Sequence, residues 1–375
     1  MRPIVIAAGG TGGHFFPAEA LAAALIARGN RVVLMTDARS GGLKSAVFAN
    51  REAYVLPGAG IAGRGLLRGA KAAAALLAGI KRARSILKAI DAGVVVGFGG
   101  YPCVPPVVAA GLMRHRPAVI LHEQNAVLGR ANRFLANRFL TGPTDRLALN
   151  FAATQRLPAK ARSEVVGNPV RPAIAALAEA GYVAPQTGPA ARIRLLVLGG
   201  SLGARVFSDI VPDALIALPD AIRARLTVTQ QCRQEDLDRV RAAYAAAGIA
   251  AELAPFFDDV ATRLLGAHLV IARAGASTVA ELAVAGRPSI LVPLPGAIDD
   301  HQSANARALA QAGGAWVMAQ PDFTPGALAA RLGALLIDPA ALATAAVGAR
   351  TQAQPNATAR LADMVEALMP QDVHS

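Results

Sequence analysis

Cysteine is nearly absent from this chain of 375 residues, which has only Cys103 and Cys232. Two cysteines so far apart argue against a disulfide framework or a thiolate zinc site, and they suit a protein of the reducing cytosol. Aromatic residues are also scarce, at 4% of the chain. Because no stacking motif is found among them, nucleic acid is not an expected partner.

Long apolar runs are missing as well. No stretch reaches the roughly 18 residues that a membrane-spanning helix needs, and glycines interrupt the N-terminal apolar run after Ala8, which excludes a signal peptide. The chain is nevertheless 54% hydrophobic and 17% charged, so it can bury a large core. Its length suits two domains. We therefore expect a soluble or peripheral protein of two domains.

Acidic residues are rare in the first half only. Up to residue 170 there are 22 Lys and Arg against 7 Asp and Glu, a net charge of +15. The remainder has 16 against 18, a net charge of −2. A genome rich in arginine codons would raise the number of basic residues in both halves equally. The one-sided charge therefore predicts an anionic partner, with a membrane or a phosphorylated lipid favoured over nucleic acid.

Short β-rich runs alternate with Ala/Leu-rich stretches, the pattern of a parallel α/β sheet. Strands are expected at Pro3–Ala8, Arg31–Thr36, Val94–Gly97, Ala118–His122, Glu164–Val166, Ile193–Leu198, Leu226–Thr229, Glu252–Ala254, His268–Ala272 and Ser289–Pro293. The segments IVIAAGGTGGH, from residue 4, and LLVLGGSLGAR, from residue 195, each place a Gly-Gly turn after a strand. This coarse repeat predicts two Rossmann-like domains.

The domain boundaries follow from this repeat. The first domain is expected to cover residues 1–168 and the second 169–351, with the proline-containing segment GNPVRP (Gly167–Pro172) at the hinge. A C-terminal helix, within about 352–370, has no strand after it. We expect it to pack back on the first domain.

The first glycine loop, GGTGGH (Gly9–His14), follows a strand and precedes a helix. In that position, backbone N–H groups and a helix N-terminus face an anion, usually a phosphate. The loop does not match the dinucleotide fingerprint, because Phe15 occupies the place of the third glycine. A plain tight turn is the alternative. His14 lies at the helix start, where a neutral imidazole is favoured, and this makes it a candidate general base.

Two further motifs of the first half lie at strand ends. HEQN (His122–Asn125) lies where ligands bind in open α/β sheets. GFGGYP (Gly97–Pro102) is another glycine turn, for which a packing role and a functional role are equally compatible with the sequence.

The second half contains a stretch suited to a nucleotide diphosphate, RAGASTVAEL (Arg273–Leu282). It opens a helix after a strand, so that its amides and the hydroxyls of Ser277 and Thr278 can bind phosphate. Glu281 lies one turn further on the same face, where it can accept both ribose hydroxyls. A helix capping box is the alternative explanation. After the next strand, DDHQ (Asp299–Gln302) offers polar groups to a sugar.

Metal ligands are not expected. The only D-x-D, at residues 236–238, lies in the charged helical run RQEDLDRVR, which is typical of a solvated helix face. The basic amphipathic segment Gly60–Lys88 is different. It combines Leu66, Leu67, Leu76, Leu77 and Ile80 with Arg64, Arg68, Lys71, Lys81, Arg82, Arg84 and Lys88. Such a segment can lie on anionic lipid, and an ordinary core helix is the alternative.

Taken together and in this order, GGTGGH, GGYP, HEQN, GNPVR, GGSLGAR, AGAST and DDHQ resemble the motifs of the MurG family. These enzymes are the UDP-N-acetylglucosamine:lipid I N-acetylglucosaminyltransferases of bacterial peptidoglycan synthesis. The resemblance covers nearly the whole chain. It implies a GT-B fold, two Rossmann-like domains with parallel sheets facing across a cleft. The second domain would bind UDP-GlcNAc and the first would face lipid I and the membrane.

The resemblance also implies site residues. His14 matches the catalytic histidine. The matches to substrate-binding positions are Thr11, Gly12, Gly13, Asn125, Arg171, Ser201, Phe257 (through its backbone, to uracil), Ala276, Ser277, Thr278, Val279, Ala280, Glu281 (to ribose) and Gln302 (to the sugar). Two departures are small: Leu202 stands where glutamine is frequent, and Ala274 where serine is common.

The implied reaction is transfer of N-acetylglucosamine to the C4 hydroxyl of the muramoyl sugar of lipid I, giving lipid II and UDP with inversion and without metal or cofactor. It would take place at the cytoplasmic face of the inner membrane, in support of cell wall synthesis, cell shape and division. A UDP-GlcNAc 2-epimerase shares layout and donor but needs no basic first half. A dinucleotide-dependent oxidoreductase lacks support because of Phe15.

Overall fold

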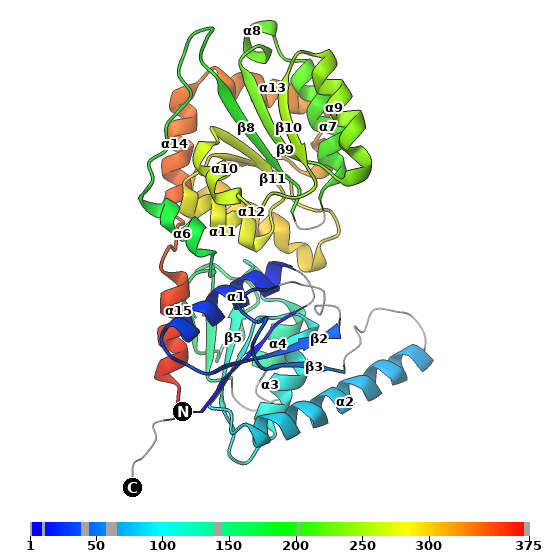
Figure 1. The fold of residues 1–375 in the computed structure, drawn as a ribbon, viewed down its shortest axis with the longest axis vertical. Coiled ribbons are helices and arrows are strands. Elements are labelled where there is room, and N and C mark those ends of the chain that lie inside the picture. Colours follow the sequence, from blue (N-terminus) through cyan, green and yellow to red (C-terminus); the bar gives the residue numbers. More distant parts are fainter. Residues whose placement is uncertain are drawn as a thin grey trace. The chain divides into compact units, whose positions relative to one another are not determined.

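The chain forms two compact units. The computed structural model describes residues 2–9, 12–38, 45–57, 66–137, 144–200 and 203–370. The N-terminal unit comprises Met1–Arg171 together with Asn356–Ser375, and the C-terminal unit comprises Pro172–Pro355 (Figure 1). The chain passes from one unit to the other at residues 171/172 and 355/356, whereas the sequence predicted boundaries at 168 and 351. The GNPVR segment belongs to the N-terminal unit, because the Gly167 amide donates to the Leu149 carbonyl and Val170 is buried.

The N-terminal unit is built on a seven-stranded sheet in the order β3-β2-β1-β4-β5-β6-β7. Its strands are β1 Ile4–Ala7, β2 Val32–Asp37, β3 Ala53–Leu56, β4 Val94–Gly97, β5 Ala118–Glu123, β6 Arg146–Leu149 and β7 Ser163–Val165. All adjacent pairs are parallel. Both β1 and β4 are buried along their whole length, as expected for central strands covered on two faces.

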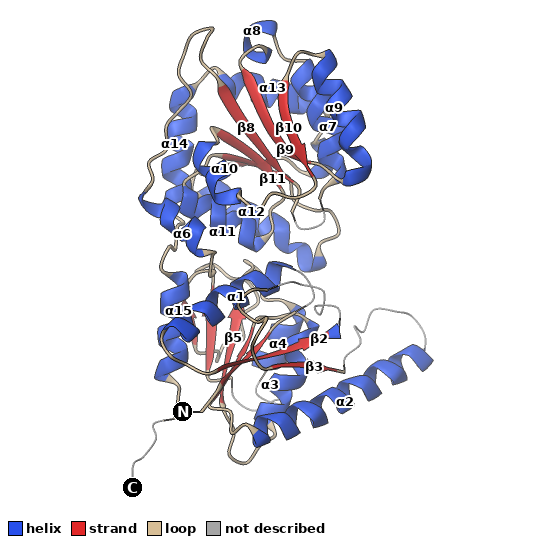
Figure 2. Cartoon of the chain, in the orientation of Figure 1, coloured by secondary structure: helices blue, strands red, loops and turns tan. Residues whose placement is uncertain are grey.

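Helices cover both faces of this sheet (Figure 2). The helices are α1 Gly12–Ala27, α2 Leu66–Ala89, α3 Val104–Gly111, α4 Arg130–Ala136 and α15 Ala357–Ala367. Strand residues alternate between two clusters: Ile4 and Ile6 pack with α1 and α15, while Val5 and Ala7 pack with α2, α3 and α4. Arg28, directly after α1, binds both Asp363 and Glu366 of α15, with N–O distances of 2.7 and 2.8 Å.

The C-terminal unit contains a six-stranded parallel sheet in the order β10-β9-β8-β11-β12-β13. Its strands are β8 Ile193–Leu198, β9 Leu226–Gln231, β10 Ala250–Ala254, β11 Leu269–Ala272, β12 Ser289–Leu291 and β13 Ala315–Val317. Its α-helices are α6 Pro172–Ala175, α7 Arg205–Ile216, α8 Asp220–Arg223, α9 Leu237–Ala246, α10 Val260–Gly266, α11 Ala276–Ala285, α12 His301–Gln311, α13 Pro325–Leu336 and α14 Pro339–Arg350. Apolar residues of α7, α9 and α13 share one core cluster with β8.

Within the described residues, no single helix is both long and apolar enough to cross a membrane. The pair α13 and α14 passes that test by length and composition, but the two are bent by 96° at the break between them. Leu328, Leu332 and Leu342 of this pair are fully buried in the core of the C-terminal unit. These helices therefore pack as core elements.

Candidate functional site

Each sheet reverses its strand order at one point, and four of the predicted motifs follow the strands on either side of these points. The reversal falls between β1 and β4 in the N-terminal unit and between β8 and β11 in the C-terminal unit. Ligands of open α/β sheets bind outside the carboxyl ends of the strands at such a point. The first glycine loop and GFGGYP follow β1 and β4, and GGSLGAR and RAGAST follow β8 and β11. The topology therefore brings four motifs to two ligand-binding positions.

At the first of these positions, the imidazole of His14 lies against the glycines that follow β4. A Cβ atom added to Gly99 would lie 3.4 Å from Cδ2 of His14, and one added to Gly100 would lie 3.7 Å from its Nε2. Both glycines have positive φ, 81° and 68°, which other residues rarely adopt. The backbone of the GFGGYP turn therefore forms one wall beside the candidate base.

The rest of the first glycine loop is described in part. Gly12 is buried in the first turn of α1, and Gly13 is exposed there. Thr11 lies outside the described residues. His14 itself is partly exposed, so solvent or a substrate can reach it.

A second histidine, His122, is fully buried behind this position. Its Nε2 lies 2.9 Å from the Gly167 carbonyl oxygen. Because a carbonyl only accepts, Nε2 carries the proton of the neutral ring. Burial lowers the pKa of His122 to about 4; the hydrogen bond to Gly167 opposes this shift, and the charge of His14 adds to it. His122 thus stays neutral near pH 7 and joins β5 to the GNPVR segment.

Glu123 organises the loop that contains Asn125. Its Oε1 accepts hydrogen bonds from the backbone and side-chain amides of Asn125, at 2.9 and 3.1 Å. Its Oε2 accepts from the Gly129 amide, at 2.8 Å, and from the side chain of Asn132, at 3.0 Å. The carboxylate is 3% exposed. Four N–H donors hold it as a positioning residue for Asn125, a role that the sequence motif alone did not reveal.

The remaining predicted residue of this unit is Arg171. It is partly exposed and ends the first stretch of the N-terminal unit. It follows Asn168 and Val170, which are both buried. The buried residues fix the backbone of the segment, so that Arg171 extends from an anchored stretch.

In the C-terminal unit, α11 begins directly after β11, with Gly275 as its N-cap. Ser277, Thr278, Ala280 and Glu281 are partly exposed, whereas Ala276 and Val279 are buried. Ala276 and Val279 are 6% and 2% exposed, so they present little surface to a ligand. Ser277 and Glu281 are four residues apart and share one face of the helix. A helix N-terminus of this kind suits an anion such as a diphosphate, and Glu281 lies one turn further along the same face.

Gln302 lies in the first turn of α12. Its Oε1 accepts a hydrogen bond from the Leu294 amide at 2.9 Å, which leaves the amide nitrogen as the end that can donate to a sugar. The two residues before the helix, Asp299 and Asp300, have φ of 55° and 52°. Strained backbone of this kind is common at ligand-binding loops.

Phe257 follows β10 and turns its ring inward. The ring is 5% exposed, and the guanidinium carbon of Arg263 lies 3.9 Å from its centre. With its side chain committed, Phe257 can meet a base only through its backbone, as the family resemblance implies.

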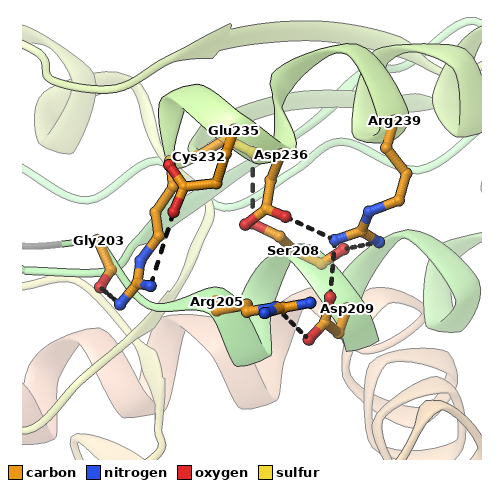
Figure 3. A network of polar contacts seen from close by, with 9 residues as sticks. Gly203, Arg205, Ser208, Asp209, Cys232, Glu235, Asp236 and Arg239 are labelled. Atoms are coloured by element: carbon orange, nitrogen blue, oxygen red, sulfur yellow. Dashed lines mark hydrogen bonds and ion pairs between the residues drawn. The ribbon is translucent and has the colours of Figure 1, made fainter.

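The second glycine loop has Ser201 and Leu202 outside the described residues. Its remaining part contacts the segment after β9, where Arg233 donates to the Gly203 carbonyl at 3.4 Å. Figure 3 shows the adjoining network on α7: Asp209 lies between Arg205, at 3.6 Å, and Arg239, at 2.7 Å. The ion pair between Asp209 and Arg239 thus joins the first half of α7 to α9.

The described residues contain no cluster of side chains suited to bind a metal ion. No group of three or more His, Cys, Asp or Glu side chains in those ranges could hold an ion.

Comparison with known proteins places the chain in a family. Residues 4–141 match the glycosyltransferase family 28 N-terminal domain, and residues 194–361 match the family 28 C-terminal domain. The chain belongs to glycosyltransferase family 28. The resemblance to MurG and the two-domain α/β fold expected from the sequence are confirmed, and the dinucleotide-dependent oxidoreductase is not supported.

Relatives within family 28 extend over the whole chain. A protein of Granulibacter bethesdensis is 63% identical over 97% of this chain and 93% of its own length. It is named UDP-N-acetylglucosamine--N-acetylmuramyl-(pentapeptide) pyrophosphoryl-undecaprenol N-acetylglucosamine transferase. The crystal structure of Acinetobacter baumannii MurG is 32% identical, covers 98% of this chain and 100% of that one, and has a TM-score of 0.78.

One further neighbour bears on the alternative function. A structure assigned to a UDP-N-acetylglucosamine 2-epimerase of Listeria monocytogenes has a TM-score of 0.65 at 15% identity, covering 98% of this chain and 96% of that one. At that identity the likeness shows the fold alone. The names of the relatives, such as the 63% identical transferase, support the transferase over the epimerase.

Proposed function

We propose that this chain transfers N-acetylglucosamine from UDP-GlcNAc to lipid I, giving lipid II and UDP. One observation carries the proposal: the candidate donor motif opens α11 at the strand-order reversal of the C-terminal sheet, with Ser277 and Glu281 on one partly exposed face. The name of the 63% identical relative supports the choice of substrates.

The C-terminal unit would bind the donor. Amides at the start of α11 and the hydroxyls of Ser277 and Thr278 would meet the diphosphate, and Glu281 would accept the ribose hydroxyls. The backbone at Phe257 would meet uracil, and Gln302 would meet the sugar. As the bond between the anomeric carbon and the diphosphate breaks, the UDP gains negative charge, which the helix N-terminus stabilises.

The N-terminal unit would bind the acceptor. The C4 hydroxyl of the muramoyl sugar attacks the anomeric carbon from the side opposite UDP, which inverts its configuration. His14 would take the hydroxyl proton, as a neutral imidazole can. Asn125, held by Glu123, and Arg171 would orient the acceptor and its diphosphate.

A direct assay tests this function. Purified enzyme is incubated with UDP-GlcNAc and lipid I in EDTA, and lipid II is measured by chromatography. We expect turnover close to that without EDTA, since the proposed phosphate contacts are amides, hydroxyls and arginine. Failure to form lipid II with or without Mg²⁺ would reject the reaction. Loss in EDTA that Mg²⁺ restores would reject metal independence alone.

Substitution of Glu281, on α11, tests the donor site. Replacing Glu281 with alanine is expected to weaken UDP-GlcNAc binding by about 1.5–3 kcal/mol, the worth of a hydrogen bond to a charged group. Titration calorimetry without acceptor measures this. Glu179→Ala, at an exposed position of the same unit, is the matched control and should bind normally. Unchanged affinity in Glu281→Ala would remove this carboxylate from the site.

We also propose that the enzyme is peripheral at the cytoplasmic face of the inner membrane, bound through α2. This helix carries exposed basic residues and Leu77, which is 67% exposed. Basic residues near anionic lipid contribute about 1 kcal/mol each. Residues 60–65 of the predicted segment, including Arg64, lie outside the described residues.

Reversal of four charges tests the membrane surface. The variant carries Glu at Lys71, Lys81, Arg82 and Arg84. Its binding to phosphatidylglycerol vesicles in a flotation assay is expected to fall on the order of 100-fold or more, because each basic residue near the surface contributes about 1 kcal/mol. Binding to phosphatidylcholine vesicles should change little.

The matched control carries the same change of net charge on the C-terminal unit. Its four replacements by Glu are at exposed Arg192, Arg241, Arg307 and Arg331. Vesicle binding should remain near that of the unaltered protein. An equal loss in both variants would mean that net charge, rather than α2, governs binding.

A further inference from the structure

The side-chain amide of Gln231 joins the two loops that follow the strands on either side of its own strand, β9. Gln231 is the last residue of β9, which lies between β8 and β10, and it is 6% exposed. Its Oε1 accepts from the Gly199 amide at 3.0 Å. Its Nε2 donates to the Gly200 carbonyl at 2.9 Å and to the Pro255 carbonyl at 3.1 Å. The one acceptor and both N–H bonds of the amide are therefore used.

This set of partners requires an amide of this length. One partner is a donor and two are acceptors, so a carboxylate would face two carbonyl oxygens with no proton to offer. An apolar side chain would leave a buried N–H and two carbonyls unpaired, which costs more than the hydrogen bonds themselves contribute. Asparagine is shorter by one methylene and cannot span the same three groups.

On the β8 side, Gly199, Gly200 and Gly203 are at positions where a larger residue would clash or be strained. A Cβ at Gly199 would lie 2.4 Å from the Ala204 nitrogen. Gly200 and Gly203 have φ of 81° and 67°, and the Gly203 amide donates to the Gly200 carbonyl at 3.1 Å. That carbonyl thus accepts two bonds, one from the loop and one from Gln231, and its direction is fixed.

On the β10 side, the same amide fixes the peptide that leads to Phe256. Because peptide groups are planar and trans, the bond to the Pro255 carbonyl also sets the direction of the Phe256 N–H. Phe256 is 57% exposed, whereas Phe257 is anchored by its buried ring. The backbone of this segment is therefore held from both ends.

We propose that Gln231 is a positioning residue for the donor nucleotide. It sets the glycine loop after β8 and the Pro255–Phe257 segment together, so that the backbone of both meets UDP. This inference rests on the proposed donor site of the C-terminal unit. Gln231 does not touch the reacting atoms; it acts through the two loops that it holds.

A matched pair of variants provides the test. Gln231→Met removes the three hydrogen bonds at similar size. Gln230→Met changes the preceding residue, whose side chain points to the opposite face of β9, accepts from the Tyr244 hydroxyl at 2.6 Å and is fully buried. Both variants should unfold at lower temperature. Calorimetry with UDP alone should show binding weakened about 10-fold or more in Gln231→Met and less than about 2-fold in Gln230→Met, since tenfold corresponds to about 1.4 kcal/mol.

Steady-state kinetics give a second readout. In Gln231→Met the KM for UDP-GlcNAc should rise, while the KM for lipid I stays near that of the unaltered enzyme. A purely structural role would lower the amount of active enzyme and leave both KM values unchanged. A folded Gln231→Met variant with unaltered UDP affinity, or an equal loss in Gln230→Met, would overturn the positioning role.

Hydrogen exchange on the unaltered protein keeps the inference testable if Gln231→Met does not fold. The Gly199 amide should exchange slowly without ligand, and UDP should slow exchange in the glycine loop and in residues 255–258 together. Protection of only one segment would overturn the coupling. If the unaltered protein does not bind UDP, the proposed donor site itself fails; if Glu281→Ala weakens UDP binding and Gln231→Met does not, only the role of Gln231 fails.

Discussion

His14→Ala should lower turnover by roughly 10²–10⁴-fold, the usual worth of general acid–base catalysis. The imidazole lies beside Gly99 and Gly100 at the strand-order reversal of the N-terminal sheet. UDP-GlcNAc affinity should hardly change, because the proposed donor contacts belong to the C-terminal unit. Steady-state kinetics and donor calorimetry measure the two effects separately.

The pH profile separates a base from a structural histidine. A catalytic imidazole must be neutral, so the rate of the unaltered enzyme should fall on the acid side, and His14→Ala should lose that limb. His115→Ala, at an exposed histidine of the same unit, is the control and should keep it. A stable, donor-binding His14→Ala enzyme with near-normal turnover would transfer the role of base to another group.

Buried His122 adds a second acid dependence, which acts through stability rather than through the catalytic step. The pKa of His122 is lowered to about 4 in the folded protein, against about 6.5 for an ordinary histidine. The unfolded chain therefore binds its proton first. The stability that depends on neutral His122 is fully present above about pH 6.5 and is lost as the pH falls through about 4.

Glu123→Ala is expected to have the largest effect on stability. Four N–H groups converge on this buried carboxylate, from Asn125, Gly129 and Asn132. Removal leaves buried donors unpaired, each costing about 1–3 kcal/mol, and water entering the loop recovers part of that. We expect the free energy of unfolding of the N-terminal unit to fall by on the order of 3 kcal/mol, measured by denaturant titration.

The same substitution should also impair acceptor use below its unfolding midpoint, since Asn125 loses its anchor. Glu164→Ala is the matched control. That carboxylate lies on β7 of the same sheet with its side chain 56% exposed and 3.9 Å from Arg360, and an exposed ion pair contributes about 0–1 kcal/mol. A Glu123→Ala protein as stable as this control would show that the four hydrogen bonds contribute little.

The central strands were predictable because their residues are buried on both faces. Ile4–Ala7 and Val94–Gly97 are continuous β-branched or small apolar runs that end in glycine turns. Three strands were not expected: β3, β6 and β13. Both β3 and β13 are edge strands with exposed positions. The sequence of β6, Arg-Leu-Ala-Leu, favours helix, and only pairing with β5 makes it a strand.

Site residues were predictable where all residues of a motif are close together in the sequence. His14 and the run from Ser277 to Glu281 each follow a strand within a few residues, so their positions came directly from the sequence. Gln231 has no such signal, because its partners Gly199 and Pro255 are 32 and 24 residues away. Hydrogen bonds between side chain and distant backbone appear only when the strand order is known.

The last helix of the chain completes the core of the unit in which the chain begins. Leu361, Ala362 and Val365 of α15 are buried in one cluster with Ile4 and Val94. On the ribosome, all of residues 172–355 must therefore emerge before the N-terminal sheet can finish covering that face. Nascent domains generally fold from the N-terminus onward; here the C-terminal unit is the first whose chain is complete. Until α15 emerges, the nascent protein presents apolar surface to chaperones and proteases, and a chain that lacks α15 keeps this surface exposed.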